Sequence, residues 1–452
     1  MNIPREIFRE YDIRGLAESH LVDPAPYELG RAIGTFLRRE GSHRVVLGKD
    51  CRLSSPRIAG GISKGLLESG LDVVNLGAVA TPLMYFSLHH FEDVDGGVMV
   101  TASHNPGDYN GVKIASGSST IYGQQIQEIW ELSRTQDFEE GVGCEQEREI
   151  LSAYEKMVRE RVGRLGRDLR VVVDAGNGMA GNLAPNIYRE LGCQVFELYC
   201  ELDGSFPNHH PDPTVTGNLQ ELIKEVEFRQ ADLGIAFDGD GDRIGVVDEK
   251  GNIVWGDELM VLFSRDVLKR NPGATVIGEV KCSMNLYNDI EANGGKALMW
   301  KTGHSLIKAK MKETGAALAG EMSGHIFFSE GYFGFDDATF AGARLLKIIA
   351  DTGKGVGEQL ADLPKLHSTP EIRVDIPEDC KSQVVEELRV FFSALYETVT
   401  IDGIRVVFDD GWALVRASNT EPVLVLRFEA ETHERLEEIR TLVEAKLADV
   451  MR

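Results

Sequence analysis

The sequence contains no apolar run that approaches the roughly 18 residues a membrane-spanning helix requires. Its first ten residues, Met1 to Glu10, carry charged side chains where a secretory signal peptide needs an apolar core. We therefore expect a protein that has no membrane partner and works in the cytoplasm.

Cysteine is scarce, with six among 452 residues, and the six form no Cys-x-x-Cys pair and have no histidine cluster beside them. Neither a disulfide framework nor a zinc site is indicated. We expect these cysteines to be reduced thiols.

Positive charge is also in short supply. The chain has 48 Lys and Arg against 72 Asp and Glu, which leaves a net charge of −24. A surface of this kind repels a nucleic-acid backbone and an anionic membrane. We therefore expect no nucleic acid as the main partner.

The length of 452 residues suggests three or four domains. Short apolar runs alternate with amphipathic segments of helical length, which is typical of α/β domains with covering helices. After Pro370 the pattern changes to an α+β one, with a strand, a helix, three strands and a last helix. Polar stretches place the predicted boundaries near residues 149, 251 and 366, giving domains 1–149, 150–251, 252–366 and 367–452.

Nine apolar runs in the first three domains have the length and composition of buried strands. They are Arg44–Gly48, Leu71–Leu76, Gly97–Val100, Leu169–Val173, Val195–Leu198, Leu233–Phe237, Thr275–Val280, Ala297–Trp300 and Ala317–Ala319.

In each of these three domains, one apolar strand runs directly into a polar loop punctuated by glycine or proline. The loops are Thr101–Pro106, Asp238–Arg243 and Gly320–His325. In open α/β sheets, ligands bind in the crevice beyond the carboxyl ends of the strands. We expect the three loops to face one shared cleft.

The second loop, Asp-Gly-Asp-Gly-Asp-Arg, places three carboxylates within five residues: Asp238, Asp240 and Asp242. Three such charges repel one another unless a hard divalent cation takes them as oxygen ligands. A solvated acidic turn is the simpler alternative, but buried-looking strands flank the loop. A calcium EF-hand fails because Arg243 stands where that loop requires glycine.

Ser103 and the adjacent His104 suggest a serine hydrolase, but the Gly-x-Ser-x-Gly elbow is absent and neighbouring residues rarely face each other. A serine beside a metal site fits phosphoryl transfer better. Taken alone, a serine in a loop such as Ser103 is most often a turn or cap residue, so its catalytic interpretation depends on the other loops.

The segment Arg416–Pro422 places a guanidinium, two hydroxyls, an amide and backbone N–H groups around one turn. This set of donors suits a phosphate. A plain turn between two strands, held by serine and asparagine side chains, is the alternative.

The four motifs Thr-Ala-Ser-His-Asn-Pro, Asp-Gly-Asp-Gly-Asp-Arg, Gly-Glu-Met-Ser-Gly-His and Arg-Ala-Ser-Asn-Thr-Glu-Pro occur in this order along the whole chain. In this the chain resembles the α-D-phosphohexomutases, and most closely the bacterial phosphomannomutase/phosphoglucomutase branch. The segments Phe8–Gly15, Gly48–Arg52, Asn110–Ile114, Asp203–Pro213 and Lys301–Ser305 also fit the family pattern.

The resemblance implies three related α/β domains with mixed sheets around a central cleft, followed by an α+β domain of the TATA-binding-protein-like type. It implies that Ser103 is a phosphoserine between turnovers. Mg²⁺ would then be bound by a phosphoserine oxygen together with Asp238, Asp240 and Asp242.

The resemblance also implies roles for the other residues. Arg243 and Lys113 would add positive charge at the transferring group, and Lys113 and His325 are both candidates for general acid/base work. Glu321 and Ser323 would bind the sugar hydroxyls. The non-reacting phosphate would be held by Arg416, Ser418, Asn419 and Thr420, and the cleft would also present Tyr11, Arg14, Lys281 and His304 to the ligand.

The implied reaction moves a phosphoryl group between the 1- and 6-positions of mannose or glucose phosphate, with a hexose 1,6-bisphosphate as intermediate and activator.

Met322, where the glucosamine branch usually has glutamine, favours the mannose/glucose branch over phosphoglucosamine mutase. A non-catalytic sugar-phosphate-binding protein is the less favoured alternative, because Ser103 and the acidic loop are both present. A phosphatase leaves the Arg416 loop unexplained. We expect a monomer or a weak homodimer.

Overall fold

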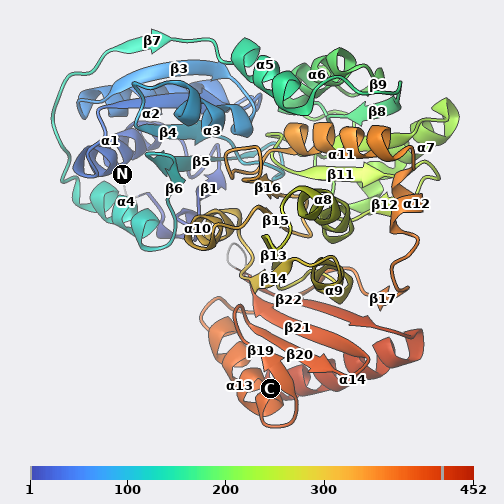
Figure 1. Cartoon of the computed structure of the whole chain (residues 1–452). Helices are drawn as coiled ribbons and strands as arrows, with labels where there is room; N and C mark the ends of the chain where they lie inside the picture. The colour runs from blue at the N-terminus through green and yellow to red at the C-terminus, as the bar shows by residue number, and fades with distance from the viewer. Residues whose placement is uncertain (1–2, 419–421, 452) are drawn as a thin grey trace.

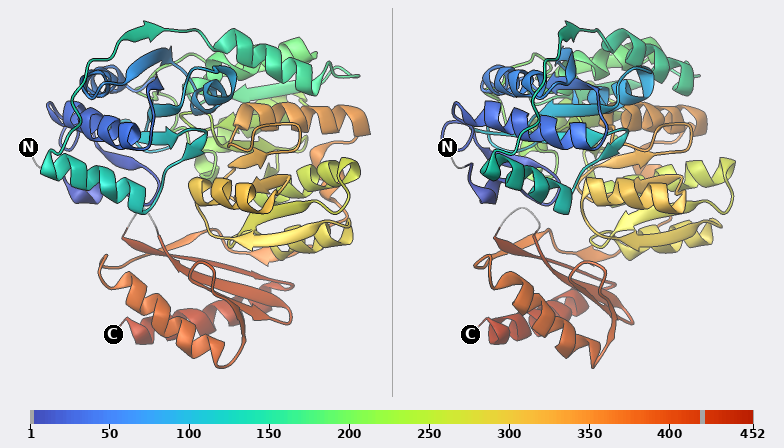
Figure 2. Two further views of the ribbon diagram at one scale, coloured as in Figure 1. Left: turned by 60° about the vertical axis from the view of Figure 1, so that its left-hand side comes forward. Right: turned by 90° about the vertical axis from the view of Figure 1, so that its left-hand side faces the viewer.

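Runs of valine, isoleucine and leucine form the centres of four sheets in the computed structural model of this chain, which describes residues 3–418 and 422–451. Figure 1 shows the first three sheets and their helices in one body, with the fourth sheet and its two helices below them. The two further views in Figure 2 show the same division.

The first sheet consists of β1 (Ile13–Leu16), β2 (Arg44–Lys49), β3 (Asp72–Ala78), β4 (Gly96–Val100), β5 (Tyr109–Ser116), β6 (Ser119–Thr120) and β7 (Glu145–Glu147). Its order is β1-β5-β4-β2-β3-β7, with β6 beside β5. Strand β2 is parallel to β3 and β4, whereas β5 is antiparallel to both β4 and β1. The helices of this segment are α1 (Ala25–Arg39), α2 (Ser55–Glu68), α3 (Thr81–His90) and α4 (Gln124–Thr135).

The second sheet has the order β12-β11-β10-β8-β9. Its strands are β8 (Arg170–Asp174), β9 (Gln194–Leu198), β10 (Leu233–Phe237), β11 (Ile244–Val247) and β12 (Ile253–Val254). Its helices are α5 (Leu151–Val162), α6 (Ala184–Leu191) and α7 (Gln220–Arg229).

The third sheet has the order β14-β13-β15-β16. Its strands are β13 (Thr275–Glu279), β14 (Lys296–Trp300), β15 (Leu318–Gly320) and β16 (Ile326–Phe328). The helices of this segment are α8 (Gly256–Arg270), α9 (Met284–Ala292), α10 (His304–Thr314), α11 (Ala338–Thr352) and α12 (Val356–Leu360).

One four-strand connectivity recurs in all three sheets. In each, the first strand lies between the second and the third, parallel to both, and the fourth returns antiparallel beside the third. The sets are β2 to β5, β8 to β11 and β13 to β16. This shared topology confirms three related α/β units with mixed sheets. Each of the three polar loops connects the third strand to the fourth of its unit.

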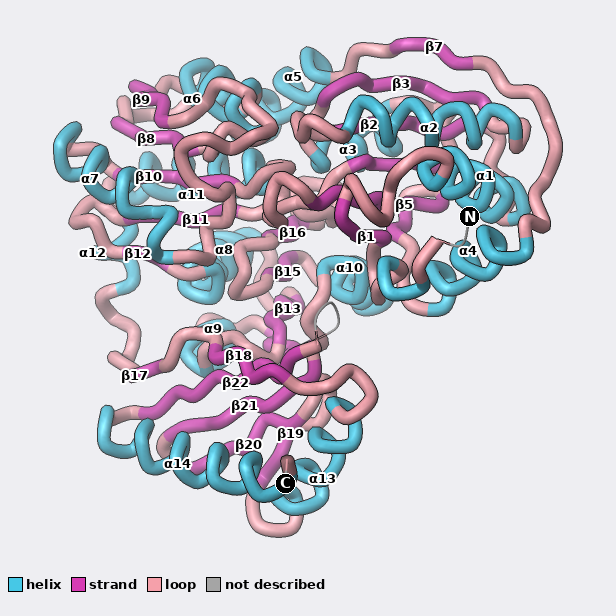
Figure 3. Tube along the Cα trace, turned by 180° about the vertical axis from the view of Figure 1, so that it is seen from behind, coloured by secondary structure: helices cyan, strands magenta, loops and turns pink. Residues whose placement is uncertain are grey.

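The fourth sheet is antiparallel throughout its described strands. It consists of β17 (His367–Ser368), β18 (Ile372–Asp375), β19 (Glu397–Val399), β20 (Ile404–Phe408), β21 (Gly411–Ala417) and β22 (Val423–Ala430). Figure 3 shows α13 (Lys381–Ser393) and α14 (His433–Val450) on the side of this sheet that faces away from the other three. The α+β prediction for this segment is confirmed, although four strands rather than three lie between its helices.

A single apolar core runs through the first three units, since Val46 of β2, Val171 of β8 and Val276 of β13 belong to the same cluster of buried side chains. Helix α11 packs against α5, α6 and α8 and so joins the second unit to the third. The fourth unit has its own core, and Trp412 and Leu414 on β21 pack against Val280 of the third unit. The three loops are therefore fixed relative to one another by packing.

All six cysteines are free thiols, as the absence of paired spacing predicts. Among the helices formed by residues 3–418 and 422–451, none is long and apolar enough to cross a bilayer.

Candidate active site

A cavity of 1030 Å³ opens where loops from all four units meet, and it contains nearly every residue singled out from the sequence. Its lining includes Tyr11, Arg14, Ser103, Lys113, Arg243, Lys281, His304, Glu321, Ser323, His325, Arg416 and Ser418. The predicted shared cleft is thus present. Asn419 and Thr420 lie outside the described residues.

Ser103 lies in the loop that follows the carboxyl end of β4, in a left-handed backbone conformation with φ of 51°. Its N–H donates to Thr101 Oγ1 at 3.0 Å, and buried Arg52 donates to its carbonyl oxygen at 2.8 Å. Its hydroxyl donates to Asp238 Oδ2 at 2.6 Å, across the contact between the first and second units. The loop thus holds one hydroxyl at the cavity wall, directly against the acidic loop.

The acidic loop is a tight turn between β10 and β11 that Asp238 itself closes. Asp238 Oδ1 accepts backbone N–H groups from Gly241, Asp242 and Arg243 at 3.1, 3.0 and 3.1 Å. Gly239 is required because a Cβ there would lie 2.5 Å from the carbonyl oxygen of Ser103. Close approach of the two loops brings the Ser103 hydroxyl and the carboxylates together.

The three aspartates of this loop are completely buried and lie behind the cavity wall instead of lining it. One oxygen from each lies within 4.8 Å of the others. Oδ1 of Asp240 and Oδ1 of Asp242 are buried without a hydrogen-bond partner among the described residues. Orphaned buried carboxylate oxygens are costly, so this arrangement fits a hard divalent cation with oxygen ligands.

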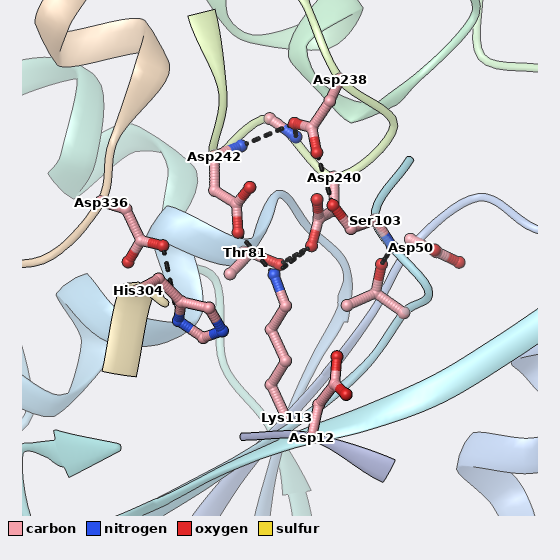
Figure 4. Close-up of polar contacts among 12 residues, drawn as sticks. Asp12, Asp50, Thr81, Ser103, Lys113, Asp238, Asp240, Asp242, His304 and Asp336 are labelled. Carbon is pink, nitrogen blue, oxygen red and sulfur yellow. Dashed lines mark hydrogen bonds and ion pairs between the residues drawn. The ribbon is translucent and has the colours of Figure 1, made fainter. Parts of the chain in front are cut away.

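Lys113 reaches from β5 to these carboxylates, as Figure 4 shows. Its Nζ donates to Asp240 Oδ2 at 2.8 Å and to Asp242 Oδ2 at 2.5 Å, and Thr81 Oγ1 donates to the same Asp240 oxygen at 2.6 Å. Burial opposes the charge on Lys113, but the two carboxylates outweigh it and raise the pKa of the ammonium well above its usual value. Lys113 is therefore a fixed cation at this site.

The pKa values of Asp238 and Asp240 shift in opposite directions. Burial, together with the charges of Asp240 and Asp242, raises the pKa of Asp238 well above its usual value. Burial acts on Asp240 in the same sense, but the Lys113 ammonium outweighs it and lowers the pKa of Asp240. The raised pKa of Asp238 reflects burial and the crowding of three carboxylates, which a bound cation would relieve.

Asp336, a buried carboxylate that the sequence did not single out, lies beside His304 and His325. Its Oδ1 accepts from Lys308 Nζ at 2.9 Å, and its Oδ2 lies 3.1 Å from His325 Nδ1 and 3.7 Å from His304 Nδ1. Arg243 Nε donates to His325 Nε2 at 2.9 Å. Nε2 is then the unprotonated nitrogen, with the Nδ1 proton toward Asp336.

Glu321 and Ser323 lie in the turn between β15 and β16, as the third motif predicts. Glu321 Oε1 accepts the N–H of Gly303 at 2.6 Å, which ties this turn to the start of α10. Its Oε2 lies 3.4 Å from the Ser323 hydroxyl and 4.0 Å from His325 Nε2. Glu321 Oε2 thus lies beside the Ser323 hydroxyl and the His325 imidazole, and all three residues line the cavity.

Arg416 at the end of β21 and Lys281 after β13 line the same cavity from the fourth and third units. Lys281 Nζ donates to Glu371 Oε2 at 3.2 Å. Arg416 Nε donates to Asp402 Oδ2 at 2.9 Å, and the N–H of Thr302 donates to the same oxygen at 3.1 Å.

Tyr11 packs edge-on against His304, with ring centroids 5.1 Å apart, and Arg14 is held by Asp12 and Asn105. Burial, with the charges of Asp12 and Glu321, raises the pKa of Tyr11 to about 12, so its hydroxyl stays protonated at neutral pH. Both side chains therefore offer donors to the cavity.

The fold and the site together are those of multidomain α/β enzymes that transfer phosphoryl groups, with an acidic loop that could hold a metal ion. Family models cover almost the whole chain. They are those of phosphoglucomutase/phosphomannomutase alpha/beta/alpha domain I at residues 5–140, domain II at 152–251, domain III at 255–367 and the C-terminal domain at 371–446. The chain belongs to the phosphoglucomutase/phosphomannomutase family.

Full-length relatives agree with this assignment. The chain is 47% identical over 449 residues to the phosphomannomutase/phosphoglucomutase of Pseudomonas aeruginosa, covering 99% of this chain and 96% of that protein. It is equally identical to the phosphoglucomutase of Neisseria gonorrhoeae, covering 98% and 97%. The crystal structure of a phosphoglucomutase/phosphomannomutase family protein from Burkholderia thailandensis superposes with a TM-score of 0.93 at 44% identity, covering 99% of this chain and 98% of that one.

Proposed function

We propose that this chain interconverts hexose 1-phosphate and hexose 6-phosphate through a phosphoserine at Ser103 and a hexose 1,6-bisphosphate. The observation that carries the proposal is the 2.6 Å contact between Ser103 Oγ and Asp238 at a cavity that Arg416 of the fourth unit also lines. One end of a phosphosugar can react there while the other end is held. Glucose or mannose phosphate is the substrate that the family relationship supports.

The transfer exchanges one phosphorus–oxygen bond for another. The bond between phosphorus and Ser103 Oγ breaks as the free sugar hydroxyl bonds to phosphorus. The hydroxyl proton passes to a base, and the freed Ser103 Oγ takes up a proton from solvent, which it gives up again when the second transfer rephosphorylates it. His325 Nε2 is unprotonated and accepts a hydrogen bond from Arg243 Nε, which a bound phosphoryl group would draw away, whereas Lys113 is held protonated by two carboxylates. We therefore assign the acid/base role to His325 and charge neutralisation to Lys113 and Arg243.

The bisphosphate then turns end for end, and its other phosphate returns to Ser103 as His325 gives the proton back to the leaving sugar oxygen. No net phosphate is consumed. The site beside Arg416 must accept either end of the sugar, so its donors serve a generic phosphate.

Mg²⁺ is the metal that we propose for the acidic loop. Asp238, Asp240 and Asp242 would hold it together with a phosphoserine oxygen, and the two orphaned carboxylate oxygens support this assignment. When bound, such a cation neutralises charge on the transferring phosphoryl group.

The sugar is tested by a coupled assay on glucose 1-phosphate, mannose 1-phosphate and glucosamine 1-phosphate, each with a trace of its 1,6-bisphosphate. We expect turnover of the glucose and mannose substrates, with glucosamine the poorest. The reverse order would identify a phosphoglucosamine mutase. Binding without turnover of any of the three would contradict the proposed function.

Replacing the sugar-binding carboxylate should lower the efficiency of the reaction. We expect Glu321→Gln to reduce kcat/KM for glucose 1-phosphate about 10- to 100-fold, because a charge-assisted hydrogen bond to a sugar hydroxyl becomes a neutral one. Initial rates over a range of substrate concentrations measure this. Glu313→Gln, an exposed residue of the same unit, is the control and should behave as wild type.

We further propose that the units end near residues 149, 251 and 366, and that the enzyme acts in the cytoplasm as a monomer or weak homodimer. The recurring strand sets support the first boundary, and the change to an antiparallel sheet supports the third. Strand β12 (Ile253–Val254) still pairs within the second sheet, so the second unit extends a few residues beyond 251. Six free thiols support a reducing compartment.

A further inference from the structure

Asp402 lies in the turn between β19 and β20 and accepts two hydrogen bonds from different units of the protein. Its Oδ2 accepts from Arg416 Nε at 2.9 Å and from the backbone N–H of Thr302 at 3.1 Å. The side chains of Asp402 and Arg416 are 14% and 5% exposed, so this is a largely desolvated ion pair. Asp402 thus joins the fourth unit to the third at the edge of the cavity.

The first bond determines how Arg416 presents its guanidinium. Because Asp402 occupies Nε, the two terminal nitrogens are left for a ligand, and Nη2 is buried without a partner among the described residues. A buried guanidinium nitrogen without an acceptor is costly in the absence of ligand. Arg416 lines the cavity, so an anion there would supply the missing acceptor.

The second bond connects Asp402 to the sugar-binding turn. Thr302 is followed directly by Gly303, whose N–H donates to Glu321 Oε1 at 2.6 Å. The Thr302 hydroxyl donates to buried Glu279 at 2.6 Å, which fixes this loop. Asp402 therefore contacts the loop that positions Glu321 as well as the arginine at the phosphate end.

We propose that Asp402 is a positioning residue for the non-reacting phosphate: it orients Arg416 toward the phosphate of a bound phosphosugar and sets its distance from Glu321. The ligand is a hexose phosphate monoester, so this inference rests on the proposed function. Asp402 does not touch the ligand and acts through Arg416 and the loop at Thr302.

The chain offers a matched control on the surface of the same unit. Asp410 Oδ1 accepts from Arg435 Nε at 2.8 Å, which is the same kind of pair as Asp402 with Arg416. The side chains of Asp410 and Arg435 are 41% and 32% exposed, and neither lines the cavity. An exposed pair of this kind contributes little to stability.

We expect Asp402→Ala to raise KM for glucose 1-phosphate about tenfold and to change kcat less than about twofold. The held phosphate is bound alike in the ground state and the transition state, so its loss weakens binding uniformly. Asp402→Asn keeps an acceptor oxygen and should show a smaller rise in KM. Asp410→Ala should match wild type in both constants.

A double-mutant cycle separates positioning from a general loss of structure. Asp402→Ala should add less than about twofold to the KM of Arg416→Ala, because the residue through which it acts is already gone. Equal factors in the two backgrounds would show that Asp402 acts independently of Arg416. That outcome would overturn the proposal.

Titration calorimetry with glucose 1-phosphate keeps this test apart from the test of the proposed function. A wild-type protein that binds the sugar phosphate but does not turn it over contradicts the function, and the Kd of the Asp402 variants still decides the positioning role. Unchanged Kd and KM in both Asp402→Ala and Asp402→Asn would overturn the inference about Asp402 alone. Thermal melting of each variant verifies that it is folded.

Discussion

Ser103→Ala should lower mutase turnover by roughly 10³-fold or more, because the phosphoryl group then has no covalent carrier between the two half-reactions. The fold should survive, since the variant loses only the hydrogen bonds of one hydroxyl, to Asp238 and His104, at about 1 kcal/mol each. The measurement is the initial rate of glucose 6-phosphate formation from glucose 1-phosphate with a trace of bisphosphate, together with a thermal melt.

A buried serine outside the site provides the control for this prediction. Ser133 in α4 is 5% exposed, and its hydroxyl donates to the Trp130 carbonyl at 2.7 Å. Ser133→Ala should keep wild-type turnover while losing a comparable hydrogen bond. A Ser103→Ala enzyme with more than about a tenth of wild-type activity would rule out Ser103 as the carrier.

Asp242→Asn should lower turnover by on the order of 100-fold, the loss typical when one group that stabilises transferring charge is removed. The amide keeps the shape of the side chain but removes one negative charge from the cage, so the cation binds more weakly. We expect the Mg²⁺ concentration for half-maximal activity to rise. Activity titrated against Mg²⁺ measures both effects.

The matched control for the loss of one negative charge is Asp351→Asn, at the end of α11, where Asp351 pairs with Lys347 on the surface. It should leave the Mg²⁺ titration unchanged. Excess EDTA should abolish wild-type turnover, and addition of Mg²⁺ should restore it. Full activity in EDTA would mean that the acidic loop only stabilises the fold.

Strands that bury apolar side chains on both faces are predictable from sequence, because a short continuous run of valine and isoleucine in a globular protein is typical of a buried strand. β5 was missed because Asn110, Gly111 and Lys113 interrupt its apolar pattern. These polar residues are buried, and Lys113 contacts carboxylates from another unit. The edge strand β7, just before the boundary predicted near residue 149, was missed because its three side chains are all exposed and polar.

The site residues divide in the same way. Ser103 and the aspartate loop stand in short motifs with characteristic spacing, so the sequence alone locates them. Asp336 and Asp402 have no such spacing, and Asp402 meets Thr302 across 100 residues of chain. The folding of the third unit brings Asp336 to the histidines, and that of the fourth brings Asp402 to Arg416. Packing of these two units against each other brings Asp402 to Thr302.

The most direct test of a phosphoserine mutase is the mass of the intact protein after incubation with glucose 1,6-bisphosphate and Mg²⁺. Wild type should gain one phosphoryl group, peptide mapping should place it on Ser103, and glucose 1-phosphate or 6-phosphate should remove it again. The Ser103→Ala protein should gain none. A phosphoryl group on another residue, or an active wild-type enzyme that never carries one, would contradict the mechanism.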